Sequence, residues 1–194
     1  KLVEEGPVLI THWGLSGPAV LRLSAWGARE LAARSYQFKV HLAWLPDYNE
    51  QRLKEAFLEW RKLHAAKKLV NHNPGLPVRL WQFLLLQTGI SDDLRFADLP
   101  AKAENALIRN LVDYVVAVSG KTTFKEEFVT AGGIQLSEVD ANTMMSKKVP
   151  NLFFAGEVLD VDGITGGFNF QHAWTSGWIA ARSISSLAEK EKLP

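Results

Sequence analysis

The sequence predicts a mixed fold of the α+β or α/β class, with β-rich segments, a three-helix insert and a final strand, loop and helix. Apolar and polar side chains alternate along residues 36–45, which is typical of a half-exposed strand. Between about 49 and 118 the apolar residues recur every three or four positions, which indicates amphipathic helices. The apolar run 152–155 precedes a glycine-rich loop and another helical segment. These patterns divide the chain into residues 1–46, 47–118, 119–150 and 151–194.

The composition favours a folded protein without a dominant charge. The 194 residues include 22 Lys and Arg against 21 Asp and Glu, and 47% are hydrophobic, which suffices for a core. A net charge of +1 is not the excess of positive charge that nucleic acid or an anionic membrane attracts, so neither is expected as a partner. Because the sequence has 0 Cys, any redox chemistry must belong to a bound cofactor.

The apolar runs are far shorter than the roughly 18 residues that a membrane-spanning helix needs. Residues 1–7 become acidic and end in Gly-Pro, which is unlike a secretory signal. We therefore expect a cytoplasmic protein. The missing initiator Met and the immediate entry into a strand-like segment favour a piece of a longer polypeptide.

Residues 1–46 are predicted to form a β-rich segment with one helix. Val8–Thr11 is a short β-favouring run, and Ser16–Pro18 opens a helix that continues to about Ala33. Tyr36–Leu45 is the alternating strand, which Pro46 ends.

Residues 47–118 are predicted to form the helical insert. Its first helix begins near Asn49 and is broken at 73–77, its second is 78–87, and its third begins near Asp98 and continues to Gly120. An i,i+4 surface pair is expected between Glu50 and Lys54, and the buried stripe of the third helix is expected to comprise Leu107, Ile108, Leu111 and Val115.

Residues 119–150 are predicted to contain a hairpin. Its arms are 122–130 and 134–139, joined by a turn at Gly132 and Gly133. The last segment, 151–194, begins with Leu152–Ala155, which is too short for a helix and is interpreted as a central strand buried on both faces.

The loop between this strand and the final helix, at about 169–187, is the strongest candidate for a binding site. Gly163, Gly166 and Gly167 would let a flat or anionic ligand approach the backbone, and the helix would direct its positive end toward the same place. Glu157 follows the buried strand, where α/β folds place ligand contacts, and Asn169 begins the helix. An ordinary tight turn with solvated acids is the alternative interpretation.

No metal site is predicted. Asp160 and Asp162 lie in a loop that has no acid at the twelfth position of an EF-hand. His64 and His72 lack the i,i+4 spacing of a helical metal site.

The motifs of the loop resemble a known family. Gly156–Gly163, then Gly166–Asn169 and Gln171, resemble the C-terminal flavin-binding signature of the BaiN/YhiN-type NAD(P)/FAD-dependent oxidoreductases, which include aminoacetone-oxidase-like flavoproteins. Three further stretches, 11–19, 129–134 and 143–147, follow the order and approximate spacing of that family. The resemblance covers nearly the whole chain and is least distinctive in the helical insert.

The resemblance implies FAD as cofactor, with NAD(P)H as a possible hydride source and a small organic molecule as substrate. It also implies that the strand, loop and helix at 151–194 belong to a Rossmann-type FAD domain. Members of the family are about twice as long and begin with a glycine-rich dinucleotide-binding turn, which this sequence lacks. The missing dinucleotide-binding half is therefore an expected partner, and the isolated chain is expected to be inactive and to bind FAD poorly or not at all.

The resemblance also implies roles for individual residues. Gly156 and Glu157 correspond to the strand-end pair near the ribityl and pyrophosphate groups, where related flavoproteins commonly have Gly-Asp. The residues assigned to cofactor binding are Gly156, Glu157, Asp160, Gly163, Gly166, Gly167, Phe168, Asn169 and Gln171.

Two further sets of residues are assigned roles toward the substrate. Thr130, Gly132 and Gly133 are assigned to the substrate side of the flavin, with a hairpin turn that needs positive φ as the alternative. His12 is the one histidine inside a matched motif and is the candidate proton donor, with a satisfied polar side chain as the alternative.

The sequence thus predicts the C-terminal part of a flavin-dependent oxidoreductase that passes hydride between NAD(P)H, FAD and an organic substrate such as an unsaturated carbonyl compound. An amine oxidase-type flavoenzyme is the alternative chemistry. A helical interaction module without catalysis is the alternative from another class.

Overall fold

The computed structural model describes residues 2–122, 129–164 and 166–191 of the chain. Two compact units can be distinguished: unit 1 comprises Lys1–Tyr36 and Gly120–Pro194, and unit 2 comprises Gln37–Ser119. The described residues contain six α-helices and two two-stranded sheets, so the predicted mixed fold is confirmed, and of the two predicted classes the structure has the α+β one.

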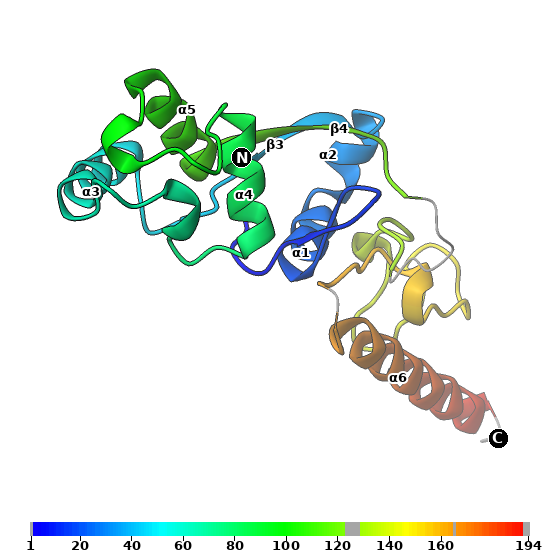
Figure 1. The fold of residues 1–194 in the computed structure, drawn as a ribbon. Coiled ribbons are helices and arrows are strands. Elements are labelled where there is room, and N and C mark those ends of the chain that lie inside the picture. Colours follow the sequence, from blue (N-terminus) through cyan, green and yellow to red (C-terminus); the bar gives the residue numbers. More distant parts are fainter. Residues whose placement is uncertain (1, 123–128, 165, 192–194) are drawn as a thin grey trace. The chain divides into compact units, whose positions relative to one another are not determined.

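Unit 2 is a strand pair with a group of helices (Figure 1). Its elements are β3 (Gln37–Leu42), α3 (Glu50–Leu63), α4 (Val78–Gln87), α5 (Ala101–Val112) and β4 (Tyr114–Ser119), with short 3-10 turns at Leu69–Asn71 and Phe96–Asp98. Strands β3 and β4 pair antiparallel, from Gln37 opposite Ser119 to Leu42 opposite Tyr114. The unit therefore includes both strands as well as the whole of the expected insert at 47–118.

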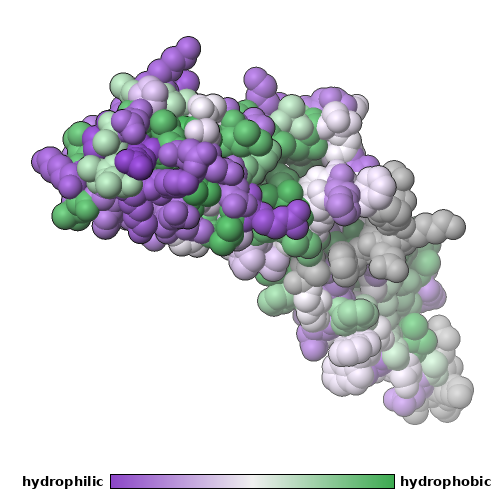
Figure 2. Space-filling view, in the orientation of Figure 1, coloured by the Kyte–Doolittle hydropathy of each residue, from purple (hydrophilic) through white to green (hydrophobic). Residues whose placement is uncertain are grey.

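Helices α3 and α4 of unit 2 begin where the sequence predicts them, and the local signals at the start of α3 are satisfied. The Asn49 side chain accepts a hydrogen bond from the Arg52 N–H at 2.8 Å and so caps α3. Lys54 forms the expected ion pair with Glu50 at 2.7 Å. The shared core is apolar: it contains Leu45, Leu53, Phe57, Leu69, Trp81, Leu84, Leu85, Ile90, Phe96, Leu99, Leu107, Ile108 and Leu111. Hydrophilic side chains cover much of the visible face of this helix group (Figure 2).

The third helix is shorter than predicted. Helix α5 ends at Val112, and the residues assigned to its continuation form β4. Val115, expected in the buried stripe, is 46% exposed. The run from Tyr114 to Val118 is rich in β-branched residues, and β3 supplies the partner that makes a strand more favourable than a helix there.

Unit 1 begins with a small hairpin of β1 (Leu9–Ile10) and β2 (Leu15–Ser16). The single helix expected up to Ala33 is two helices, α1 (Pro18–Trp26) and α2 (Ala28–Ala33). They meet at Gly27, where a Cβ would lie 2.6 Å from Leu2 Cδ1. A larger residue at this junction would therefore require the Leu2 side chain to move.

The hairpin predicted across 122–139 is wrong in its second arm. Ile134 forms a parallel bridge with Leu159, and Leu136–Glu138 is a 3-10 turn. Residues 123–128, most of the first arm, lie outside the described residues. The polar groups of Ile134 are instead bonded to the loop, because its N–H donates to Val158 O at 2.9 Å and its carbonyl accepts from Asp160 N at 3.0 Å.

The central strand predicted at Leu152–Ala155 is also wrong. Phe153 forms one antiparallel bridge with Met145, and the segment is half-buried or exposed. A central strand needs neighbours on both edges, whereas the described residues supply this one bridge. The segment leads through the 3-10 turn η4 (Gly156–Val158) to the long final helix α6 (Phe168–Glu191), which Figure 1 shows with its loops.

Among the described residues, none of the helices combines the length and apolar character required to cross a bilayer.

One histidine of unit 2 is held in an aromatic environment. The ring centroid of His72 lies 4.8 Å from that of Trp60, 5.3 Å from that of Phe96 and 5.0 Å from that of His64. Burial lowers the pKa of His72 from its ordinary value of 6.5, and the charges of Lys67 and His64 lower it further. The folded unit therefore favours the neutral imidazole.

This pKa shift predicts a pH-dependent stability. As pH falls through about 6.5, the unfolded chain binds a proton at His72 more readily than the folded one, so the free energy of unfolding decreases toward lower pH. The His72→Phe variant should lose this part of the dependence when urea unfolding is measured between pH 8 and pH 5. An unchanged difference between the two ends of that range would contradict the prediction.

Candidate functional site

A pocket of about 230 Å³ lies beside the start of α6 in unit 1. It brings together three residues that the sequence assigned to cofactor binding, namely Glu157, Gly166 and Asn169. The full lining is Val129, Glu157, Val161, Gly166, Asn169, Phe170, His172 and Ala173. Residues from η4, the loop and the helix therefore meet at one cavity.

The Asn169 amide holds the loop against the first turn of α6. Its Oδ1 accepts a hydrogen bond from the Gly163 N–H at 2.8 Å, and its Nδ2 donates to the Gly163 carbonyl at 3.2 Å. A Cβ at Gly163 would lie 3.2 Å from the same Oδ1 atom and from Phe168 Cβ. A side chain at position 163 would therefore crowd the Asn169 amide that binds its backbone. The two residues together shape one wall of the pocket.

A second set of hydrogen bonds joins η4 to α6. The Gly156 N–H donates to Ser176 Oγ at 2.9 Å, and that hydroxyl donates to the His172 carbonyl at 2.7 Å. Ser176 is only 3% exposed. Sequence analysis did not select Ser176, because its importance depends on η4 folding back onto the helix.

Glu157 is connected to the segment assigned to the substrate side. One of its carboxylate oxygens, Oε1, accepts a hydrogen bond from the Thr130 N–H at 2.9 Å. Because Val129 also lines the pocket, the structure brings Thr130 to this site. A carboxylate with one backbone partner retains lone pairs for a ligand hydroxyl.

The glycines of the site differ in what surrounds them. A Cβ at Gly167 or Gly132 would meet no atom within 4 Å, and at Gly166 only Phe168 Cδ2 at 3.8 Å. At Gly133, by contrast, a Cβ would lie 2.6 Å from Val158 O. Gly133 is thus required by the parallel contact with the loop, whereas Gly132, Gly166 and Gly167 leave open space.

Six of the nine residues assigned to cofactor binding lie outside the described pocket lining, namely Gly156, Asp160, Gly163, Gly167, Phe168 and Gln171. Asp160 pairs with Arg29 at 2.5 Å, and this contact raises the pKa of the Arg29 guanidinium. Gln171 donates to Thr175 Oγ1 at 3.0 Å along the helix surface. Phe168 is 64% exposed, and Gly156 precedes Glu157 in η4.

His12 lies in the turn between β1 and β2 and is exposed. This turn is organised by the Thr11 hydroxyl oxygen, which accepts from the N–H groups of Trp13 and Gly14 at 3.2 and 3.1 Å. The described pocket lining does not include His12. It includes a different histidine, His172, that sequence analysis did not select because it lies beyond the glycine-rich motif.

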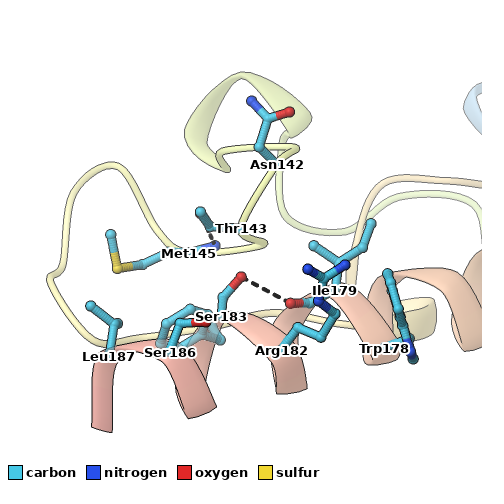
Figure 3. A pocket seen from close by; sticks show the side chains of 10 residues that line it. Asn142, Thr143, Met145, Trp178, Ile179, Arg182, Ser183, Ser186 and Leu187 are labelled. Carbon is cyan, nitrogen blue, oxygen red and sulfur yellow. Dashed lines mark hydrogen bonds between the residues drawn. The ribbon is translucent and has the colours of Figure 1, made fainter. Parts of the chain in front are cut away.

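A larger hollow of about 370 Å³ lies farther along α6 (Figure 3). Trp178, Arg182 and Ser183 line it from the helix, opposite Asn142, Thr143 and Met145 of the preceding loop. The Arg182 guanidinium lies 4.7 Å from the centroid of the Trp178 ring. None of the residues assigned from the sequence is in its described lining.

The described residues include no group of three or more His, Cys, Asp or Glu that could hold a metal ion.

Comparison with known proteins gives the family. The model of the HI0933-like protein barrel and H2TH domain matches residues 1–129, and the chain belongs to this family. The chain is 39% identical over 180 residues to the ribosomal RNA dihydrouridine synthase of Escherichia coli K12, with 91% of this chain and 42% of that protein covered.

Two other relatives match over a similar share of their length. The ribosomal RNA dihydrouridine synthase of Haemophilus influenzae is 35% identical, with 92% of this chain and 42% of that protein covered. The 3-dehydro-bile acid delta(4,6)-reductase of Clostridium scindens is 30% identical, with 94% and 44% covered. The chain thus spans less than half the length of each of these curated relatives.

The Asn169 contacts predict a local stability effect. Asn169→Ala removes both hydrogen bonds to Gly163, and it should lower the free energy of local opening at Gly163 by about 1–3 kcal/mol. Hydrogen exchange of the Gly163 amide measures this change. Gln171→Ala is the matched control in the same helical turn and should leave that amide protected. Equal protection in wild type and Asn169→Ala would contradict the assigned role.

Proposed function

We propose that this chain supplies one wall of the FAD site of a flavin-dependent oxidoreductase of the BaiN/YhiN type. The observation that carries the proposal is the pocket at the start of α6, in which Glu157, Gly166 and Asn169 meet. These residues were assigned to the cofactor from the sequence motif, and they come from three consecutive structural segments. The segment 152–155, the loop and the helix would complete a Rossmann-type domain with the dinucleotide-binding half.

The size and surface of the pocket indicate that it would bind part of the cofactor rather than all of it. Complete ligands usually occupy pockets of roughly 300–1,000 Å³, and this one measures about 230 Å³. The open backbone at Gly166 and Gly167 could lie against a flat ring, because no Cβ intervenes. The positive end of the helix dipole at the start of α6 favours partial negative charge nearby.

The names of the relatives support reduction of a carbon–carbon double bond as the reaction class. Dihydrouridine is uridine with its ring double bond reduced, and a delta(4,6)-reductase acts on two double bonds of its bile acid. Bound FAD would supply hydride transfer from NAD(P)H to such a bond, with a proton completing the reduction. The residues of this chain would bind and orient the ring and exclude water.

The net charge of the chain and the substrates in the names of the relatives both bear on the choice of substrate. The net charge of +1 argues against nucleic acid as a partner of this chain, and that expectation stays a prediction. Two relatives carry ribosomal RNA in their names and one carries a bile acid. We propose a conjugated carbonyl compound as the shared chemistry, since uridine also contains a double bond next to a carbonyl.

The test of the cofactor site is a pair of glycine variants in the natural full-length protein. Gly167→Val places a side chain in the open space beside the pocket, whereas Gly177→Val does the same within α6, where a Cβ also meets no atom within 4 Å. Gly167→Val should weaken FAD binding about tenfold or more, and Gly177→Val should bind as wild type does. Binding is measured by titration of the flavin absorbance. Equal affinities in the two variants would count against the site.

The isolated chain gives a second prediction. Residues 1–194 alone should shift the absorbance spectrum of added FAD little or not at all, because most phosphate and adenosine contacts would come from the dinucleotide-binding half. A tight complex with the isolated chain would show that this expectation is wrong.

A further inference from the structure

One polar atom beside the pocket has no partner. His172 lines the pocket from α6, and its Nε2 is buried without a hydrogen-bond partner among the described residues. Its backbone is fixed, since the His172 carbonyl accepts the Ser176 hydroxyl at 2.7 Å. The imidazole is therefore held beside the cavity by the same contacts that join η4 to the helix.

An unpartnered buried nitrogen is costly. Leaving such a group without a hydrogen bond destabilises a protein by roughly 1–3 kcal/mol, and native structures satisfy the large majority of buried polar side-chain atoms. A phenylalanine or leucine would fill similar space without this cost. A histidine at this position is therefore explained if Nε2 finds its partner in a molecule that enters the pocket.

We propose that His172 donates a hydrogen bond from Nε2 to the flavin ring, an inference that rests on the proposed function. The ring offers carbonyl oxygens and ring nitrogens as acceptors, and it gains negative charge when it is reduced. Nε2 itself is shielded from water, and a shielded donor binds the more negative form more strongly. His172 would thus contribute to cofactor affinity and favour the reduced flavin, a role that does not require the exposed His12.

The experiment compares three variants of the natural full-length protein, measured with and without FAD. His172→Phe removes the donor and keeps a planar ring, and His172→Gln keeps an N–H donor. Thr175→Val, on the exposed side of the next helical turn, is the control. The readouts are the melting temperature of the apoprotein, the Kd for FAD and the flavin reduction potential.

His172→Phe is expected to have opposite effects on the apoprotein and on the FAD complex. The apoprotein of His172→Phe should melt at or above the wild-type temperature, because an unsatisfied group has been removed. Its Kd for FAD should rise about tenfold. Its reduction potential should fall by about 30 mV, the two-electron equivalent of a tenfold change. His172→Gln should recover part of both losses, and Thr175→Val should match wild type.

Other results would overturn one proposal or the other. If His172→Phe binds FAD with wild-type affinity and potential, the role of His172 is wrong while the FAD site stands. If its apoprotein melts well below wild type, Nε2 is satisfied by a structural water, and the inference is again wrong. If wild type and Thr175→Val both fail to bind FAD, the proposed function itself fails.

Discussion

The candidate site depends on the hydrogen bonds that hold the loop after η4 against α6. Two contacts are made by side chains of the helix: Ser176 accepts the Gly156 N–H, and Asn169 binds both backbone groups of Gly163. Without them the glycine-rich loop would have little reason to stay extended, because glycine loses more conformational entropy on ordering than any other residue. The helix therefore acts as the template on which the pocket is built.

The pocket combines open backbone at Gly166 with the imidazole of His172, whose Nε2 has no partner among the described residues. Gly133 packs against the backbone of Val158 and so brings residues 129–133 next to the loop. Gly166 and Gly167 are not used for such packing and remain available. A cavity with an unobstructed backbone, a carboxylate at Glu157 and a donor at His172 has the mixture of apolar space and few polar groups that small-molecule sites require.

Much of the fold could be predicted where local signals decide it. Helix α4 has the predicted bounds of Val78–Gln87, and α3 begins after its cap at Asn49, because periodicity and capping are properties of neighbouring residues. The prediction fails where the pairing partner of a segment, or the lack of one, depends on residues distant in sequence. Tyr114–Ser119 became a strand because β3 lies beside it. Leu152–Ala155 did not, because pairing rather than apolar character makes a strand.

The sequence by itself determined the amphipathic helices and a mixed fold of helices and strands, since these depend on composition and spacing along a few turns. The motif containing Glu157, Gly166 and Asn169 was assigned from its resemblance to a known family. The tertiary structure alone decided which of the assigned residues share a cavity. It separated Asp160, paired with Arg29, from the pocket, and it added Phe170 and His172. The physical reason is that a hydrogen bond such as that between Gly156 and Ser176 joins residues 20 positions apart, and no local pattern encodes that contact.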